Sequence, residues 1–511
     1  MEIRMACKRI LLGLIFSMML LETTRAEEHI QPLGVNNAVE IALANNLNLR
    51  LQREEVDRNQ GGVLVEKGEF DAILAAELMS QEEQKMSPVA IGSPQQETFL
   101  EWNTSLQKKM TFGSEFSLSW QNNRTDTDSS FTLLNPSYYS GVIFSLRQPL
   151  LKGRGVEVQT ANLRAARRQV EAEIFLVDSR AADLAAEVKK AYWELVFAGQ
   201  DIEVKNLSLT LAKKLRDETR EKIVAKVMAP VEIYEPESEV ALREKLLIQG
   251  ERAIGAAEDD LKLLLNSNDW GESLVTSDLP QLSGKLPNLE QVLQYALNNR
   301  PDIKAADLKI KAAHITVNGA RNRTLPSLDL SGAVGVSGTD NTYGNSLDNV
   351  SNRSDTMWQV GLVLSVPLGN YSAEGNYRQA KANLAQAEIR AELVRQQVRR
   401  SAREAVRDVR LAVKGVEAAE KTTLATMKRL EAEQEKFPVG LATANNVLEA
   451  QTAYAEALSS EHRFRAEYAM AMAELDRIQG LITLDKKLGE QVDFEGFLQP
   501  TGEDIKSLNG H

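Results

Sequence analysis

Side chains that could catalyse a reaction or hold a metal are scarce in this sequence. Its 511 residues include four histidines and one cysteine, Cys7. His314 stands alone on a helical pattern, and we interpret it as a packed or solvated side chain. The sequence contains no glycine-rich phosphate loop after a strand, no paired histidines at metal-ligand spacing and no nucleophile elbow. We therefore expect no enzyme, no cofactor and no metal.

Carboxylates are abundant, but their number alone identifies no site. The chain has 72 acidic and 60 basic residues, which gives a net charge of −12. Such a surface repels the phosphates of nucleic acid, so we expect no nucleic-acid partner. What the carboxylates do must be judged from the elements that position them.

The first 26 residues have the pattern of a secretory signal peptide. Arg4, Lys8 and Arg9 precede an apolar stretch over 10–21, and the small residue Ala26 follows. The apolar stretch is shorter than the roughly 20 residues that span a bilayer as a helix. No later stretch has the length and apolarity of a transmembrane helix, so a mature chain that enters a membrane must do so as strands.

The remainder contains two related halves. Three pairs of segments match in the same order, which indicates tandem duplication; chance similarity among alanine-rich helices is the alternative. The pairs are VEIALANNLNLRLQ with LQYALNNRPDIKAA, FSLRQPLL with LVLSVPLG, and EKIVAKVMAPVEIYEPESEV with EKFPVGLATANNVLEAQTAY. We expect a leader over 1–26, a first repeat over 27–280, a second over 281–482 and a flexible tail over 483–511.

Each repeat is expected to contain a helix, strands, a very long helix, a break and a further helix. The longest proline-free stretches with helical apolar spacing predict rods of roughly 100 Å, which must pack along neighbours because no globular core can bury them. The expected helices cover 37–66, 155–229 and 231–265 in the first repeat, and 289–321, 373–437 and 444–480 in the second.

Between these helices the hydrophobic period changes from 3.6 to 2. Phe116, Leu118 and Trp120 alternate with polar residues, and other segments of about ten residues within 70–150 and 327–367 do the same. Polar loops are expected at 81–96, 122–136 and 338–355. The pattern favours transmembrane strands, and a soluble sandwich or hairpin domain capping a coiled coil is the alternative.

The number of strands then predicts an assembly. One chain offers four to six, whereas a closed transmembrane barrel needs about eight, and an open sheet edge is excluded in lipid. Several protomers must therefore share one barrel. The spacing favours six strands with a tight turn at 111–114, and in the alternative the hairpin over 100–120 extends the outer surface and leaves four.

With these features the chain resembles the TolC-like outer-membrane efflux proteins, the outer-membrane factors of tripartite efflux or type I secretion systems. The resemblance rests on the element order, on QPLL and VPLG, and on VGLATANNVLEAQ from Val439. It implies a mainly α fold with transmembrane β, in which long α-helical hairpins form a helical barrel. It also implies a homotrimer that shares a β-barrel in outer-membrane lipid, with a periplasmic adaptor (membrane fusion protein) and an inner-membrane transporter as partners.

The resemblance also assigns candidate residues to the periplasmic tip. Gly440 permits the turn because glycine tolerates positive φ, and Thr443 is placed to cap the next helix. The expected tip turn and adaptor contacts are Val439, Gly440, Leu441, Thr443, Lys226 and Met228. The candidate tunnel-gate residues, where relatives carry an acidic ring, are Asn446, Glu449, Glu232 and Glu235.

This chain departs from the family pattern at two of these positions. Asn446 replaces the usual aspartate, and Lys226 occupies the position of the turn glycine. We therefore expect an altered acidic ring and different adaptor contacts at the two tips. The alternative for the carboxylates is an exposed helical face, where they stabilise the helix dipole.

The predicted function is a passive exit duct across periplasm and outer membrane for substrates exported by an inner-membrane pump through an adaptor. The expected location is the outer membrane, with an extension into the periplasm. The alternative is a periplasmic coiled-coil scaffold or adaptor without a pore. The sequence specifies neither the exported substrate nor the pump.

Overall fold

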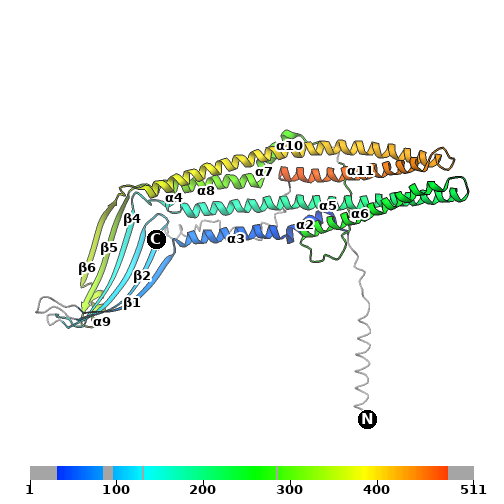
Figure 1. Cartoon of the computed structure of the whole chain (residues 1–511). Helices are drawn as coiled ribbons and strands as arrows, with labels where there is room; N and C mark the ends of the chain where they lie inside the picture. Colours follow the sequence, from blue (N-terminus) through cyan, green and yellow to red (C-terminus); the bar gives the residue numbers. More distant parts are fainter. Residues whose placement is uncertain (1–31, 85–95, 129–131, 283–285, 482–511) are drawn as a thin grey trace, which may run out of the picture. The chain divides into compact units, whose positions relative to one another are not determined.

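The computed structural model describes residues 32–84, 96–128, 132–282 and 286–481 (Figure 1). The expected leader, the expected tail and part of the 81–96 loop lie outside these residues. The helices are α2 (Val35–Asn45), α3 (Leu47–Gly68), α4 (Val156–Gln159), α5 (Ala161–Val224), α6 (Tyr234–Leu265), α7 (Leu289–Asn299), α8 (Pro301–Arg323), α9 (Tyr343–Ser351), α10 (Tyr371–Lys436) and α11 (Ala444–Gln479), with a 3-10 turn η1 (Pro230–Ile233). The strands are β1 (Ala72–Gln84), β2 (Gln96–Lys109), β3 (Glu115–Thr127), β4 (Ser137–Pro149), β5 (Ser327–Asp340) and β6 (Asp355–Ser365). The expected class, mainly α with a set of strands, is confirmed.

The chain divides into two compact units, and each draws on both sequence repeats. The tip unit comprises the described parts of 1–47, 181–292 and 402–482. The sheet unit comprises those of 48–180, 293–401 and 483–511. The boundaries of the two compact units therefore do not coincide with the boundary between the two sequence repeats.

The helices expected over 37–66 and 289–321 are each broken once, which corrects the expectation of single helices. The breaks fall at aligned positions: Asn46 and Arg300 have extended ψ angles of 128° and 129°. Arg300 precedes Pro301, whose ring disfavours a helical conformation in the residue before it. The side-chain amide of Asn46 instead donates to the carbonyl of Leu264 at 2.9 Å. Two different causes, a following proline in one repeat and a long-range hydrogen bond in the other, thus accompany the same break.

In the tip unit, Tyr192 of α5 joins three segments in a buried contact. Its hydroxyl donates to the carbonyl of Leu33 at 2.9 Å and accepts from the amides of Ser277 and Asp278 at 3.2 and 3.1 Å. The carboxylate of Asp278 accepts from the first amide of α2, that of Val35, at 2.7 Å. Burial raises the pKa of Tyr192. These bonds hold the start of α2 and the 275–278 segment against α5.

The sheet unit contains one antiparallel sheet in the order β1-β2-β3-β4-β5-β6. The hairpin over 100–120 belongs to this sheet, so the prediction of six strands is confirmed over the alternative of four. The tight turn closes with a bond from the Met110 amide to the Ser114 carbonyl at 2.8 Å, and Gly113 has a φ of 102°. Pairing of β4 with β5 joins the strands of the two repeats.

The sheet has one apolar and one polar face, because side chains alternate along each strand. One cross-strand row on the apolar face is Leu74, Leu106, Leu118, Phe144, Val334 and Trp358. The neighbouring row on the polar face is Ile73, Gln107, Ser117, Ser145, Ala333 and Gln359. No described helix has both the length and the apolarity required to cross a membrane.

The loop expected over 338–355 contains helix α9, which corrects that expectation. Thr342 caps the helix by accepting from the amide of Asn345 at 3.3 Å. Tyr343 packs edge-on against Trp102 with ring centroids 5.3 Å apart. The buried hydroxyls of Ser346 and Ser140 lie 3.1 Å apart. Local capping and packing onto strand residues therefore make this polar segment helical.

Candidate functional site

The candidate site consists of the two helix-reversal segments of the tip unit. We call residues 222–235, from the end of α5 to the start of α6, the first tip, and residues 436–449, from the end of α10 to the first turns of α11, the second tip. Both begin with the same helix-ending motif, in which one residue adopts the left-handed conformation: Lys226 with a φ of 60° and Gly440 with a φ of 77°. The left-handed turn predicted for Gly440 is confirmed, and Lys226 adopts it despite its side chain.

The hydrogen bonds of the two turns correspond one to one. The Val227 amide donates to the Lys222 carbonyl at 2.9 Å, and the Leu441 amide donates to the Lys436 carbonyl at 3.0 Å. The Lys226 and Gly440 amides donate to the carbonyls three residues earlier, at 3.0 and 3.2 Å. Both turns therefore have the hydrogen-bond pattern of the Schellman motif.

Beyond the turns the two tips differ. At the second tip, Thr443 caps α11: its hydroxyl accepts from the Asn446 amide at 3.3 Å, and the Asn446 side chain accepts from the Thr443 amide at 3.3 Å. The first tip has Pro230 at the start of a 3-10 turn and no side-chain cap. Asn446, expected at a gate, is therefore part of a capping box.

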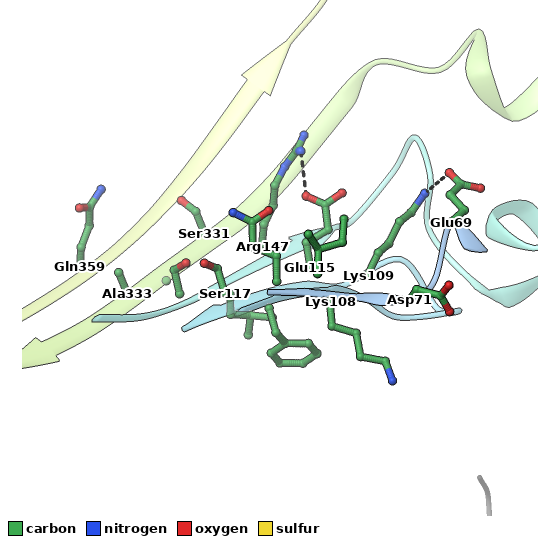
Figure 2. A pocket seen from close by; sticks show the side chains of 16 residues that line it. Glu69, Asp71, Lys108, Lys109, Glu115, Ser117, Arg147, Ser331, Ala333 and Gln359 are labelled. Carbon is green, nitrogen blue, oxygen red and sulfur yellow. Dashed lines mark hydrogen bonds and ion pairs between the residues drawn. The ribbon is translucent and has the colours of Figure 1, made fainter. Parts of the chain in front are cut away.

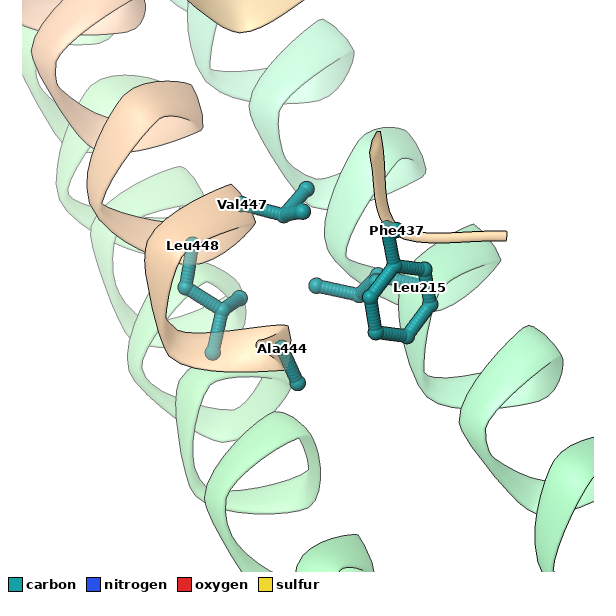
Figure 3. Close-up of a cluster of buried hydrophobic side chains, with 5 residues drawn as sticks. All are labelled: Leu215, Phe437, Ala444, Val447 and Leu448. Atoms are coloured by element: carbon teal, nitrogen blue, oxygen red, sulfur yellow. The ribbon is translucent and has the colours of Figure 1, made fainter. Parts of the chain in front are cut away.

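Phe437 is the buried centre of the second tip. It is 1% exposed and packs with Leu215 of α5 and with three residues at the start of α11: Ala444, Val447 and Leu448 (Figure 3). Met228 of the first tip packs against this cluster. Lys222 of the first tip lies over the Phe437 ring, 3.6 Å from its centroid. The cluster therefore joins the two tips, and Met228 is a packing residue.

The candidate gate carboxylates all lie on exposed surfaces, and Glu449 in addition lies beside an amide and a cationic side chain. Glu449 accepts from the side chain of Asn445 at 3.2 Å, and Arg429 of α10 lies 3.7 Å away. The first-tip candidates Glu232 and Glu235 are exposed. The acidic character of the second tip is thus reduced both by Asn446 and by Arg429.

Large apolar side chains are exposed at both tips. Val439 and Leu441 are 69% and 78% exposed, and Val227 and Val231 of the first tip are 78% and 63% exposed. Buried Phe437 and exposed Val439 are two residues apart, so only the tertiary contacts separate the core of the tip from its surface.

One buried arginine near the tips was not predicted from the sequence. Arg243 of α6 is 3% exposed, and its guanidinium donates to Glu239, to the Ser208 carbonyl of α5 and to Gln451 of α11 at 3.0, 2.8 and 2.9 Å. It also donates to the hydroxyl of Thr452 at 3.2 Å. No motif marks it, because its partners come from three helices.

Among the described residues, no group of three or more histidine, cysteine, aspartate or glutamate side chains is placed to hold a metal ion. The predicted tip residues do lie together in two adjoining turns. The four gate candidates do not form one cluster within the chain: Asn446 and Glu449 belong to the second tip, and Glu232 and Glu235 to the first.

Comparison with known proteins supports the resemblance noted above. Residues 292–481 match the family model described as outer membrane efflux protein. Two proteins of Pseudomonas putida, the solvent efflux pump outer membrane protein SrpC and the toluene efflux pump outer membrane protein TtgI, are each 26% identical over 252 residues, which is 47% of this chain and 47% of each relative. The chain thus spans about half the length of the curated relatives that it matches.

Solved structures extend the fold comparison to most of the chain. The Campylobacter jejuni CmeC outer membrane channel matches with a TM-score of 0.68 at 14% identity, covering 89% of this chain and 88% of that one. VceC of Vibrio cholerae matches with a TM-score of 0.65 at 15% identity, with 87% and 96% covered. The open state of the Neisseria gonorrhoeae MtrE channel gives 0.62 at 18% identity, with 87% and 88% covered.

These findings confirm the resemblance to the TolC-like outer-membrane efflux proteins and the fold that it implies. The family and its relatives are efflux proteins rather than enzymes, in agreement with the expectation from the sequence. The same comparisons support the expected location in the outer membrane with a periplasmic extension.

Proposed function

We propose that this chain is the outer-membrane channel subunit of a tripartite export assembly. Three copies close a shared β-barrel in the outer membrane and form a passive duct. An inner-membrane pump supplies the free energy, and a periplasmic adaptor docks at the tips. The outer edges of β1 and β6, which pair with no other strand in the described part of the chain, carry this proposal.

The two edge strands support assembly because they are exposed along almost their whole length and carry large apolar side chains on the apolar face. In β6, Trp358, Val360 and Leu362 are 80%, 68% and 66% exposed, and in β1 Leu74 and Leu78 are 72% and 76% exposed. Unpaired edges of this kind recruit further strands, and in lipid they must be closed. The strands of one chain are fewer than the about eight that the smallest barrels use, so neighbouring copies must complete the ring.

The two faces of the sheet support placement in a membrane. Apolar rows suit lipid, and polar rows suit a water-filled lumen. The contact of Trp102 with Tyr343 lies where the apolar face gives way to polar residues such as Ser140. Aromatic rings of this kind occupy the membrane interface in outer-membrane barrels.

The exposed valines and leucine of the two turns support adaptor docking at the tips. The proposed contacts are Val439, Gly440, Leu441 and Thr443 at the second tip, with Lys226 and Met228 at the first. Met228 acts there through its packing on the Phe437 cluster. The backbones of the two turns match and their side chains differ, so one adaptor would meet two related but unequal surfaces.

The proposed gate is an acidic ring weighted toward the first tip, because Glu232 and Glu235 are exposed and Glu449 has a cationic neighbour in Arg429. Glu232→Gln should reduce cation preference and calcium block of the reconstituted channel more than Glu449→Gln. Asn446→Asp should increase both. If none of the three substitutions changes the conductance or the ion selectivity of the channel, these residues do not form a gate.

A matched pair of substitutions in β6 tests the duct itself. Val360 and Gln359 are adjacent and both exposed in the single chain, but they lie on opposite faces of the sheet. In a membrane barrel, Val360→Arg places a charge in lipid at a cost of about 2–4 kcal/mol near the midplane, whereas Gln359→Arg places it in the lumen. We expect Val360→Arg to reduce the amount of trimer in the outer-membrane fraction and Gln359→Arg to leave it unchanged.

The scaffold alternative predicts no difference between the two variants. In a water-soluble protein both arginines are solvated, and the two variants behave alike. A wild-type protein that is monomeric and stable in water without detergent, and that gives no current in planar bilayers, would exclude the duct and favour the scaffold.

A further inference from the structure

The polar face of the sheet has a hollow of about 490 Å³ near the ends of the strands that adjoin the helices. Figure 2 shows that Lys109, Glu115, Arg147 and Ser331 project from the same side of the sheet, whereas Lys108 projects from the opposite side. The alternation of side chains along β2 requires this difference between neighbouring lysines. The charged and hydroxyl side chains that project into the hollow therefore come from the polar face, although residues of the opposite face such as Lys108 and Phe116 also contribute to its lining.

Three ion pairs join charged groups in and beside this hollow, on four strands and just after α3. The Arg147 guanidinium lies 2.9 Å from a carboxylate oxygen of Asp329 on β5 and 3.4 Å from one of Glu115 on β3. Lys109 of β2 pairs with Glu69 at 2.7 Å. Asp329 is 7% exposed, and Arg147 is the cation that pairs with it.

We infer that Arg147 controls the charge of this face. It keeps the face close to charge balance, so that neither cationic nor anionic solutes are held there. This inference rests on the proposed function, in which solutes pass along the polar face. One guanidinium serves two carboxylates, so its loss leaves both Glu115 and Asp329 without the cation that pairs with them. The face would then attract and retain small cations and cationic amphiphiles.

Charged thiol reagents measure this balance locally. Ser331 faces Arg147 in the β4–β5 register, and Ser331→Cys introduces a thiol of nearly the same size beside the guanidinium. In a Cys7→Ser background it is the only thiol, because Cys7 is the only cysteine of the sequence. The readout is the ratio of the modification rates by a cationic and an anionic methanethiosulfonate, measured at low ionic strength on the full-length protein in detergent.

The expected result is a shift of this ratio toward the cationic reagent in Arg147→Gln. One unit charge roughly 7 Å away in water changes the local concentration of each reagent about two- to threefold in opposite senses, so the ratio should change about fivefold. Arg147→Lys should largely preserve the wild-type ratio because it retains the charge. Lys108→Gln is the matched control: it removes a lysine charge from the opposite face and should change the ratio by less than about twofold.

Two outcomes overturn the inference: an unchanged ratio in Arg147→Gln, or an equal shift in Arg147→Lys, which would indicate a packing effect rather than charge. If Arg147→Gln does not fold, Glu115→Gln supplies the reciprocal test, and its ratio must shift toward the anionic reagent. Bilayer current from the same proteins separates this inference from the proposed function. A wild-type protein that gives no bilayer current would exclude the proposed duct function. The ratio of modification rates, in contrast, tests only the role of Arg147.

Discussion

The ammonium group of Lys222 donates a hydrogen bond to the main-chain carbonyl of Phe437 at 2.6 Å while lying 3.6 Å from the centroid of the Phe437 ring. One lysine thus adds a second donor to a carbonyl that already accepts from the Gly440 amide, and makes a cation–π contact with the aromatic core of the second tip. Because Lys222 belongs to α5 and Phe437 follows α10, this contact ties the ends of the two long helices together.

Replacing Lys222 by methionine should loosen the second tip. Loss of the hydrogen bond and the cation–π contact should lower the free energy of local opening by about 1–3 kcal/mol. Amide hydrogen exchange across 437–448 measures this. Lys436→Met is the matched control, because Lys436 occupies the same position of the other turn and pairs only with Glu433 on the surface among the described contacts. Equal exchange in both variants would contradict the assigned role of Lys222.

Adding a side chain at Gly440 and removing the side chain of Lys226 should have opposite effects on the stability of the two left-handed turns. Gly440→Ala should destabilise the second turn by about 1 kcal/mol, because a Cβ is strained at positive φ even though open space surrounds it. Lys226→Gly should stabilise the first turn by a similar amount. Exchange of the Leu441 and Val227 amides, which close the turns, reports each effect. Gly199→Ala, in the interior of α5 with open space around it, should instead be stabilising.

The capping box at the second tip should be separable from any gating charge. Thr443→Ala should cost about 1 kcal/mol at the start of α11, because the Asn446 amide loses its acceptor. Asn446→Asp keeps an acceptor for the Thr443 amide and places a negative charge in the first turn, so it should not destabilise the helix. Exchange of the Asn446 and Val447 amides tests both. A destabilised Asn446→Asp protein would argue against the capping geometry.

Arg243 should be among the most sensitive single positions of the tip unit. Arg243→Met removes the donor for Gln451, the Ser208 carbonyl and Glu239, and leaves buried acceptors unsatisfied. We expect a loss of roughly 2–3 kcal/mol, seen as earlier thermal unfolding and faster proteolysis in detergent. The control is Lys245→Met, two residues further along α6 on an exposed position. A similar loss in both variants would mean that the packing of α6 matters more than this hydrogen-bond centre.

Acid should weaken the contact between α5 and α11 through Glu474. Burial raises the pKa of its carboxyl, but hydrogen bonds from Arg477 and Lys190 outweigh burial and bring the pKa to about 2. The folded-state pKa is thus below the unfolded value of 4.5, so the stabilisation is present above pH 4.5 and is lost as the pH falls toward 2. We expect about 2 kcal/mol from this group after allowance for partial exposure.

The control for this prediction is Glu474→Gln. Its free energy of unfolding should fall less than that of the wild type as the pH is lowered from 5 to 2, because it lacks the titrating carboxyl. The neighbouring carboxyl of Asp476 acts in the opposite direction, because burial raises its pKa. The difference between wild type and Glu474→Gln between pH 2 and 5 therefore isolates Glu474. Parallel stability curves for the two proteins would show that the carboxylate contributes nothing.

Sequence reasoning went furthest where a local pattern fixes the structure. Alternation around Phe116, Leu118 and Trp120 predicted a strand because side chains alternate across a sheet. Gly440 and Thr443 were predicted to turn and cap because those conformations depend on the residue itself. The first long helix was predicted over 155–229, and α5 covers 161–224 of it because Thr160 and Lys226 interrupt the helical backbone.

Tertiary structure decided what depends on partners distant in sequence. The break at Asn46 depends on a carbonyl 218 residues away, and Arg243 meets Gln451 across 208 residues. Helix α9 forms in a polar loop because Tyr343 and Ser346 have strand residues to pack against. Local patterns thus determined the elements and their turns, whereas contacts between repeats determined where the elements break, which polar groups are buried and which carboxylates acquire cationic partners.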